Sequence, residues 1–124
     1  MNISGVGIDI ALEHRITHLA RFPNKQIAKI LTPHELSTLG RADKRVKRIG
    51  IYFSAKEAVF KSLGLKTFGP KGFREIEISI ERHGACRARL TGSLARQAGR
   101  RTRHIYLTSA VFGGWFIAQA ICVR

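Results

Sequence analysis

The segment of residues 43–65 has the longest helical pattern in the chain, and it restricts the possible folds most. Its large apolar residues recur at the spacing of one helix face: Val46, Ile49, Phe53, Phe60 and Leu63. Gly64 near its end is a common signal for a helix C-terminus, and Gly69, Pro70 and Gly72 then mark a loop. We predict one long helix over residues 43–65, followed by this loop.

The segments before this helix predict a strand and three short helices. Residues 3–10 are apolar with small residues interspersed, and they predict a buried strand that ends near Asp9. Residues 14–22 and 24–31 have apolar positions at helical spacing. Thr32-Pro33-His34-Glu35 has the pattern of a capping box with proline at the first helical position, and it predicts the start of another helix.

The segments after the long helix predict mostly strands. Residues 73–80 alternate apolar and polar side chains and predict a half-buried strand, which turns at His83-Gly84 into a second strand over residues 85–90. Three further segments complete the pattern: a short helix over residues 93–98 and strands over residues 104–109 and 115–123. This order predicts an α+β fold in which the long helix packs across a small antiparallel sheet. The length of 124 residues fits one domain over residues 1–124.

The charge balance is strongly basic, because 22 Lys and Arg residues face eight Asp and Glu residues and give a formal net charge of +14. Such a surface attracts a nucleic acid, an anionic membrane, a phosphorylated cofactor or an acidic protein, and charge alone does not choose among them. No apolar run has the length of a membrane span, and the N-terminus lacks the pattern of a secretory signal. Cys86 and Cys122 have no metal-ligand spacing, and we interpret them as reduced thiols of a cytoplasmic protein.

Three charged residues are candidates for chemistry. Glu57 and Lys61 are four residues apart and share one face of the long helix. They form either an exposed ion pair or a carboxylate for a hard cation with an ammonium group for phosphate one turn away. Asp9 follows Gly5 and Gly7, and it either accepts hydrogen bonds from the next turn or binds a metal at a strand end, where the glycines let a ligand approach the backbone.

Several segments together resemble the holo-[acyl-carrier-protein] synthase family of phosphopantetheinyl transferases. In chain order they are Gly5-Val6-Gly7-Ile8-Asp9-Ile10, Arg15-Ile16, Leu31-Thr32-Pro33-His34-Glu35 and Phe53-Ser54-Ala55-Lys56-Glu57-Ala58-Val59-Phe60-Lys61-Ser62-Leu63-Gly64. The segments Ile76-Glu77-Ile78, Gly84 and Leu90-Thr91-Gly92 resemble the hairpin of that family. The resemblance covers most of the chain, in order and at similar intervals.

The resemblance implies an enzyme that transfers the 4′-phosphopantetheine arm of coenzyme A to a serine of an acyl or peptidyl carrier protein, with release of adenosine 3′,5′-bisphosphate. It implies that Asp9 and Glu57 bind Mg²⁺, that the coenzyme A pyrophosphate completes the metal shell, and that Glu57 is the candidate base. It also implies a cytoplasmic homotrimer with active sites between subunits, in fatty acid biosynthesis. The residues expected to contact coenzyme A are Lys61, Gly64, Arg48 and Ser109. Arg15 and Arg21 are expected to contact the acidic carrier.

The chain departs from the family pattern at two positions. Tyr52 stands where many members have arginine, and Ser109 stands where many have histidine. Arg48, one helical turn before Tyr52, is a candidate for the missing phosphate contact. The loop of residues 110–114 looks longer and less polar than is usual in the family. These changes are compatible with a divergent carrier preference or with weak activity.

Other functions remain open at this point. The charge also suits a small nucleic-acid-binding module, but the aromatic strands, zinc-finger spacing and basic zipper of such modules are missing, so we expect no nucleic acid as partner. Since no apolar run has the length of a membrane span, we also expect no membrane as partner. An inactive relative that serves as an interaction subunit would fit Tyr52 and Ser109.

His14 and His18 have the spacing of a zinc pair without an evident third ligand, and we interpret them as surface histidines. The basic cluster of residues 41–48 is either solvated or binds the 3′-phosphate of coenzyme A.

Overall fold

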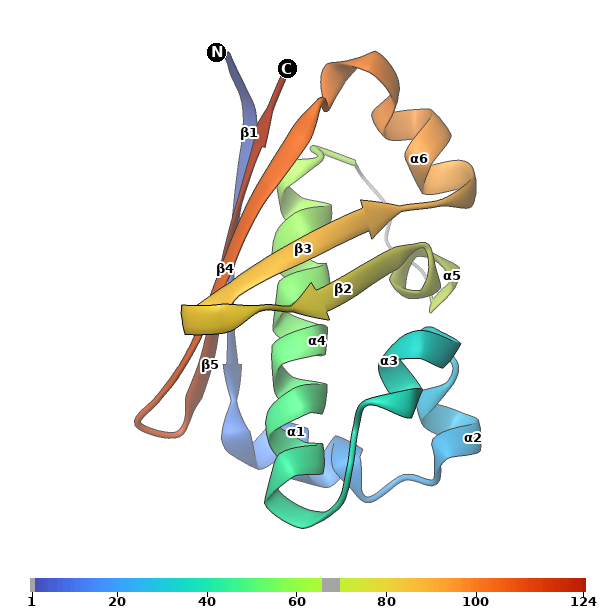
Figure 1. The fold of residues 1–124 in the computed structure, drawn as a ribbon, viewed down its shortest axis with the longest axis vertical. Coiled ribbons are helices and arrows are strands. Elements are labelled where there is room, and N and C mark those ends of the chain that lie inside the picture. The colour runs from blue at the N-terminus through green and yellow to red at the C-terminus, as the bar shows by residue number, and fades with distance from the viewer. Residues whose placement is uncertain (1, 66–69) are drawn as a thin grey trace.

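The computed structural model describes residues 2–65 and 70–124, and a five-stranded antiparallel sheet lies at its centre (Figure 1). The strand order is β1-β5-β4-β3-β2. The strands are β1 (Ile3–Leu12), β2 (Ile76–Ile80), β3 (Ala85–Leu90), β4 (His104–Phe112) and β5 (Trp115–Val123). The long helix α4 (Ala42–Ser62) packs across one face of this sheet, which confirms the predicted α+β fold.

The shorter helices surround this core. They are α1 (Glu13–Ala20), α2 (Asn24–Ile27), α3 (Pro33–Ser37), α5 (Pro70–Arg74) and α6 (Gly92–Ala98), with 3-10 turns η1 (Arg82–Gly84) and η2 (Gly99–Arg101). In Figure 1, α1, α2 and α3 lie beside the N-terminal half of α4. None of the helices in the described part of the chain is long and apolar enough to cross a membrane.

Two glycines allow β1 to approach the backbone of α4. A Cβ atom at Gly5 would overlap the carbonyl oxygen of Ser62, and one at Gly7 would overlap that of Ala58. Only glycine fits at both positions without moving the strand away from the helix. The expectation that these glycines admit a ligand was therefore wrong, because the space beside them is filled by α4.

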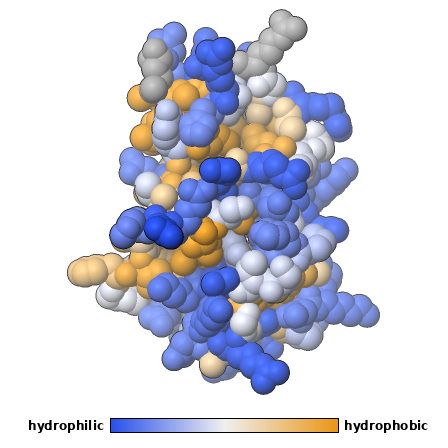
Figure 2. All heavy atoms as spheres, viewed as in Figure 1, coloured by the Kyte–Doolittle hydropathy of each residue, from blue (hydrophilic) through white to orange (hydrophobic). Residues whose placement is uncertain are grey.

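The other face of β1 is apolar and exposed. The strand was predicted to be buried, but Val6, Ile8, Ile10 and Leu12 are 43–56% exposed. The exposed aromatic side chains Tyr106, Phe112 and Trp115 of β4 and β5 extend this surface, which we call the apolar sheet face. In Figure 2, hydrophobic side chains reach the surface beside the strands on the left of the view, whereas hydrophilic side chains cover most of the opposite side. An apolar surface of this kind is a typical contact area for a partner.

Three strand boundaries differ from the prediction, and the helix expected over residues 24–31 ends at Ile27. Residues 70–74 form α5, so β2 begins at Ile76 and not at residue 73. β1 continues to Leu12, so Asp9 lies inside the strand and not at its end. β4 continues to Phe112 and pairs with β5 up to a two-residue turn at Gly113 and Gly114, both with positive φ, so the expected long loop is a tight hairpin.

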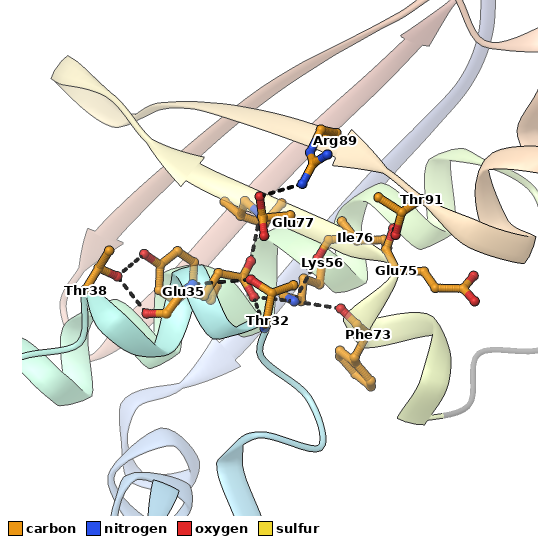
Figure 3. Close-up of polar contacts among 12 residues, drawn as sticks. Thr32, Glu35, Thr38, Lys56, Phe73, Glu75, Ile76, Glu77, Arg89 and Thr91 are labelled. Carbon is orange, nitrogen blue, oxygen red and sulfur yellow. Dashed lines mark hydrogen bonds and ion pairs between the residues drawn. The ribbon is translucent and has the colours of Figure 1, made fainter.

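A buried ion pair connects α4 to α3, α5 and β2 (Figure 3). Lys56 Nζ lies 2.6 Å from Glu35 Oε1, and both side chains are fully buried. Lys56 also donates hydrogen bonds to the backbone oxygens of Phe73 and Ile76. Glu35 accepts from the backbone N–H of Thr32, as the predicted capping box requires, and from that of Ile78. Burial lowers the pKa of Lys56, and the Glu35 carboxylate offsets part of this effect.

We predict that Lys56→Met lowers the free energy of unfolding by about 3–5 kcal/mol, because it leaves the Glu35 carboxylate buried without its cation. Urea denaturation monitored by circular dichroism measures this change. Arg89→Met is the matched control, because it removes a cation of similar length from the exposed pair between Arg89 and Glu77, and it should cost at most about 1 kcal/mol. Equal losses in the two variants would contradict the proposed importance of the buried pair.

Candidate active site

The contact between β1 and α4 brings Asp9 and Lys61 together. Lys61 Nζ lies 3.1 Å from Asp9 Oδ1 and donates a hydrogen bond to the backbone oxygen of Ile8 at 3.1 Å. The Lys61 side chain is 50% exposed and that of Asp9 is 14% exposed. Since Gly5 and Gly7 hold the strand against the helix, the position of Asp9 beside α4 follows directly from this packing.

Glu57 lies one helical turn before Lys61 and is half-buried. Burial raises the pKa of the Glu57 carboxyl above its ordinary value, and the negative charge of Asp9 raises it further. The positive charges of Lys61 and Arg15 oppose this increase. The site therefore combines two interacting carboxylates with two cations, and the unfavourable interaction between the carboxylates would be relieved by a bound metal cation.

The donor set fits a hard cation. Asp9 and Glu57 offer carboxylate oxygens, and Mg²⁺ is commonly held by one or two carboxylates while water and substrate phosphates complete its shell. Within residues 2–65 and 70–124, no cluster of three or more His, Cys, Asp or Glu side chains could hold a metal. A metal at this site would therefore need oxygen atoms from water or substrate in addition to the two carboxylates. His14 and His18 are both exposed on α1.

An open groove of about 470 Å³ runs along α1. We call it the α1 groove; it is lined by Ala11, His14, Arg15, Ile16, His18, Leu19, Phe22 and Phe53. Arg15 belongs both to this groove and to the electrostatic surroundings of Glu57, so the groove adjoins the carboxylate site. Arg21 is exposed just after the last residue of α1.

Ser109 is separated from Asp9 by a buried residue of β5. Asp9 and Ser109 both pair with Ala118 of β5, which is fully buried under α4. Two strand spacings, about 10 Å, separate them. Ser109 lines a second groove of about 390 Å³, here called the Ser109 groove, together with Lys47, His83 and other residues.

The remaining predicted contacts also lie apart from Asp9 and Glu57. Arg48 donates a hydrogen bond to the backbone oxygen of Thr38 at 2.6 Å, so part of its guanidinium group is already engaged. Gly64 follows α4 with a φ of 68° and lines a pocket that also includes Arg101 and Arg124. The described contacts thus unite Asp9, Glu57, Lys61 and Arg15, but they do not join Arg48, Gly64, Ser109 or Arg21 to this group.

Tyr52, one of the two departures from the family pattern, is part of the core. Its side chain is buried, and its hydroxyl forms a hydrogen bond with Thr38 Oγ1. Burial raises the pKa of the Tyr52 phenol. The residue therefore offers no charge to a ligand.

The grooves contain residues that the sequence patterns did not assign to a site, together with Lys47 of the basic cluster at residues 41–48, which was a candidate for the 3′-phosphate of coenzyme A. Phe22 and Phe53 line the α1 groove, and Lys47 and His83 line the Ser109 groove. One signal was available, because His14, His18 and Phe22 follow one another at intervals of four residues and so share a helical face. No comparable spacing links Lys47 and His83, since they come from different elements.

Comparison with known proteins identifies the class of protein. The sequence model of the 4′-phosphopantetheinyl transferase superfamily matches residues 5–119, and the chain belongs to that superfamily. Its relatives there are holo-[acyl-carrier-protein] synthases. The one from Nitratidesulfovibrio vulgaris is 34% identical over 110 residues, covering 86% of this chain and 88% of the relative. That from Anaeromyxobacter dehalogenans is 29% identical over 125 residues, covering 96% and 94%.

A solved structure supports the same assignment. The crystal structure of holo-[acyl-carrier-protein] synthase from Neisseria meningitidis is similar with a TM-score of 0.84 and 27% identity, over 99% of this chain and all of that one. The suspected family, the fold class and the prediction of an enzyme of this kind are confirmed.

We predict that Gly7→Ala lowers the free energy of unfolding by about 1–3 kcal/mol, because the new methyl group forces β1 away from Ala58. Ser4→Ala is the control, since Ser4 is exposed on the same strand, and it should change stability by less than about 0.5 kcal/mol. Chemical denaturation of both variants tests this. If Gly7→Ala were as stable as the parent protein, the strand would not depend on this close approach.

Proposed function

We propose that this protein transfers the 4′-phosphopantetheine arm of coenzyme A to a serine hydroxyl of an acyl carrier protein and releases adenosine 3′,5′-bisphosphate. The observation that carries the proposal is the junction of β1 and α4, which unites Asp9, Glu57 and Lys61 beside an open groove. Family membership supplies the class of reaction. A step of this kind serves fatty acid biosynthesis.

In this proposal Asp9 and Glu57 hold Mg²⁺, which neutralises charge on the pyrophosphate of coenzyme A when it is bound. Lys61 contacts the phosphate oxygens, where its ammonium group stabilises the negative charge that develops during transfer. The serine oxygen attacks the phosphorus that bears the pantetheine arm, and the bond from that phosphorus to the leaving phosphate oxygen breaks. The serine proton passes to a carboxylate oxygen of Glu57, the candidate base of this proposal.

The carrier is proposed to lie over α1. Arg15 and Arg21 are exposed on or directly after this helix, and carrier proteins of this class are acidic. Arg15 lies close enough to Glu57 to influence its charge, so a carrier bound there would present its serine near the carboxylate site. The net charge of +14 would speed the encounter with an acidic partner.

The complete site is proposed to form between subunits of a homotrimer. Within one chain, buried Ala118 separates Asp9 from Ser109. A ligand that contacts both residues would therefore bind between two subunits, with Asp9 from one and Ser109 from the other. Coenzyme A would then meet Asp9, Glu57, Lys61 and Gly64 of one subunit and Ser109 of its neighbour. Arg48 would contribute a phosphate contact only with donors that Thr38 does not use. Assembly would also cover the exposed apolar side chains of the apolar sheet face.

Transfer itself is the direct test of this function. We expect an acyl carrier protein incubated with the enzyme, coenzyme A and Mg²⁺ to gain the mass of one phosphopantetheine. Asp9→Asn and Glu57→Gln should each reduce the rate by about 100-fold or more, because each removes a charged ligand from a site with only two. Asp43→Asn is the control, since it makes the same change at an exposed carboxylate of α4.

Two outcomes would count against this proposal. Near-normal transfer by either site variant would refute the assignment of Asp9 and Glu57. Absence of transfer by the folded parent protein would favour an inactive relative.

Oligomeric state tests the assembly separately. We expect light scattering to give three times the chain mass of 13.8 kDa. Phe112→Glu should shift the protein toward monomer, because Phe112 is 78% exposed on the apolar sheet face and a buried carboxylate there would be costly. Gln26→Glu adds the same charge at an exposed position of α2 and should leave the trimer intact. A fully active monomer would exclude the composite site.

A further inference from the structure

Arg45 of α4 is bound to the connection between α1 and α2 by three hydrogen bonds. Its Nε donates to the backbone oxygen of Ala20 at 2.9 Å, and its Nη2 donates to that of Phe22 at 2.9 Å. Its Nη1 donates to Asn24 Oδ1 at 2.7 Å. Arg45 thus uses all three nitrogen atoms of its planar guanidinium group toward one short segment of chain.

The acceptors lie where the backbone most needs an external partner. Ala20 is the last residue of α1, and its carbonyl is among those that the helix leaves without an internal donor. A cation at a helix C-terminus is also electrostatically favourable. Asn24 is the first residue of α2. One guanidinium group therefore fixes the end of one helix, the turn after it and the start of the next.

This clamp bears on the α1 groove. Phe22 lines the groove, and its ring contacts His18 edge-to-face at a centroid distance of 5.9 Å, with His18 also in the groove wall. Fixing the backbone of Phe22 therefore fixes the far wall of the groove. Arg45 belongs to the same helix as Glu57 and Lys61, so it connects that wall rigidly to the carboxylate site.

We propose that Arg45 is a positioning residue, which sets the geometry of α1 and its groove relative to Glu57 and thereby the productive binding of the acidic carrier, without contacting the carrier itself. This rests on the proposed function, in which the carrier lies over α1. It also changes the interpretation of the basic cluster at residues 41–48. Arg45 is directed toward the protein's own backbone, whereas Lys44 beside it is exposed.

A substitution that keeps the charge separates this role from a direct ionic contact. Lysine at position 45 retains the positive charge, but its single nitrogen cannot reach three acceptors that a guanidinium group spans. If Arg45 acted only as a charge toward the carrier or toward a phosphate, Arg45→Lys would be nearly silent. If it acts as a clamp, Arg45→Lys should behave almost like Arg45→Ala.

The experiment compares Arg45→Lys, Arg45→Ala and the control Lys44→Ala. With each substrate varied in turn, we expect both Arg45 variants to raise the KM for the carrier about tenfold, as loss of charge-assisted hydrogen bonds predicts. The KM for coenzyme A and kcat at saturating carrier should stay within about twofold of the parent values, because Arg45 touches neither the metal site nor the reacting groups. Lys44→Ala should leave all three parameters within about twofold.

Amide hydrogen exchange provides a second readout that needs no carrier. We expect residues 20–28 to exchange about tenfold faster in Arg45→Lys than in the parent protein or in Lys44→Ala. Unchanged exchange in these residues, or an unchanged carrier KM in Arg45→Lys, would overturn the proposal. So would a rise in the KM for coenzyme A alone, which would assign Arg45 to the phosphates. A parent protein without transfer activity would instead refute the proposed function, and the exchange result would still decide whether Arg45 is a clamp.

Discussion

The close approach of β1 to α4 is the constraint on which the rest of this structure depends. Gly5 and Gly7 place the strand so near the helix that backbone atoms of one meet backbone atoms of the other. That contact puts Asp9 within reach of Lys61 and within electrostatic range of Glu57. It also turns the alternate residues of β1 outward, which creates the apolar sheet face. The candidate active site and the candidate subunit interface are thus two consequences of one packing arrangement.

Adjacent residues of α4 use charge in opposite ways. Lys56 is fully buried, and its ammonium group is neutralised by Glu35 and bound by two backbone oxygens. Glu57 is only half-buried, and it interacts with the negative charge of Asp9 and the positive charges of Lys61 and Arg15. A buried pair with every partner in place has little to offer a ligand, whereas carboxylates with an incomplete set of partners can bind a cation. Two adjacent residues of α4 therefore differ in role: Lys56 stabilises the fold, and Glu57 can bind a ligand.

The elements with strong local signals were predicted well from the sequence. The periodicity of residues 43–65 and the capping box at Thr32 depend on neighbours along the chain, and both are present within a few residues. The errors concern contacts between distant segments. Glycines on β1 do not reveal that a helix backbone will fill the space beside them, and α5 interrupts an alternation that begins at Phe73. Asp9, Glu57 and Lys61 were predicted as site residues from their spacing and from the resemblance. The proposed role of Arg45 depends on backbone acceptors more than 20 residues away, which no local pattern encodes.

The departure at Tyr52 is best understood through Thr38. The Tyr52 hydroxyl bonds the Thr38 side chain, and Arg48 bonds the Thr38 backbone oxygen. Both residues therefore hold the C-terminal end of α3 in place. This helix contains Glu35, which forms the buried ion pair with Lys56. An arginine at position 52 would have to place its charge in this buried environment or leave the Thr38 hydroxyl with only its bond to the backbone oxygen of Glu35. Position 52 is thus occupied by a packing residue, while Lys47 of the same helix is exposed and lines the Ser109 groove.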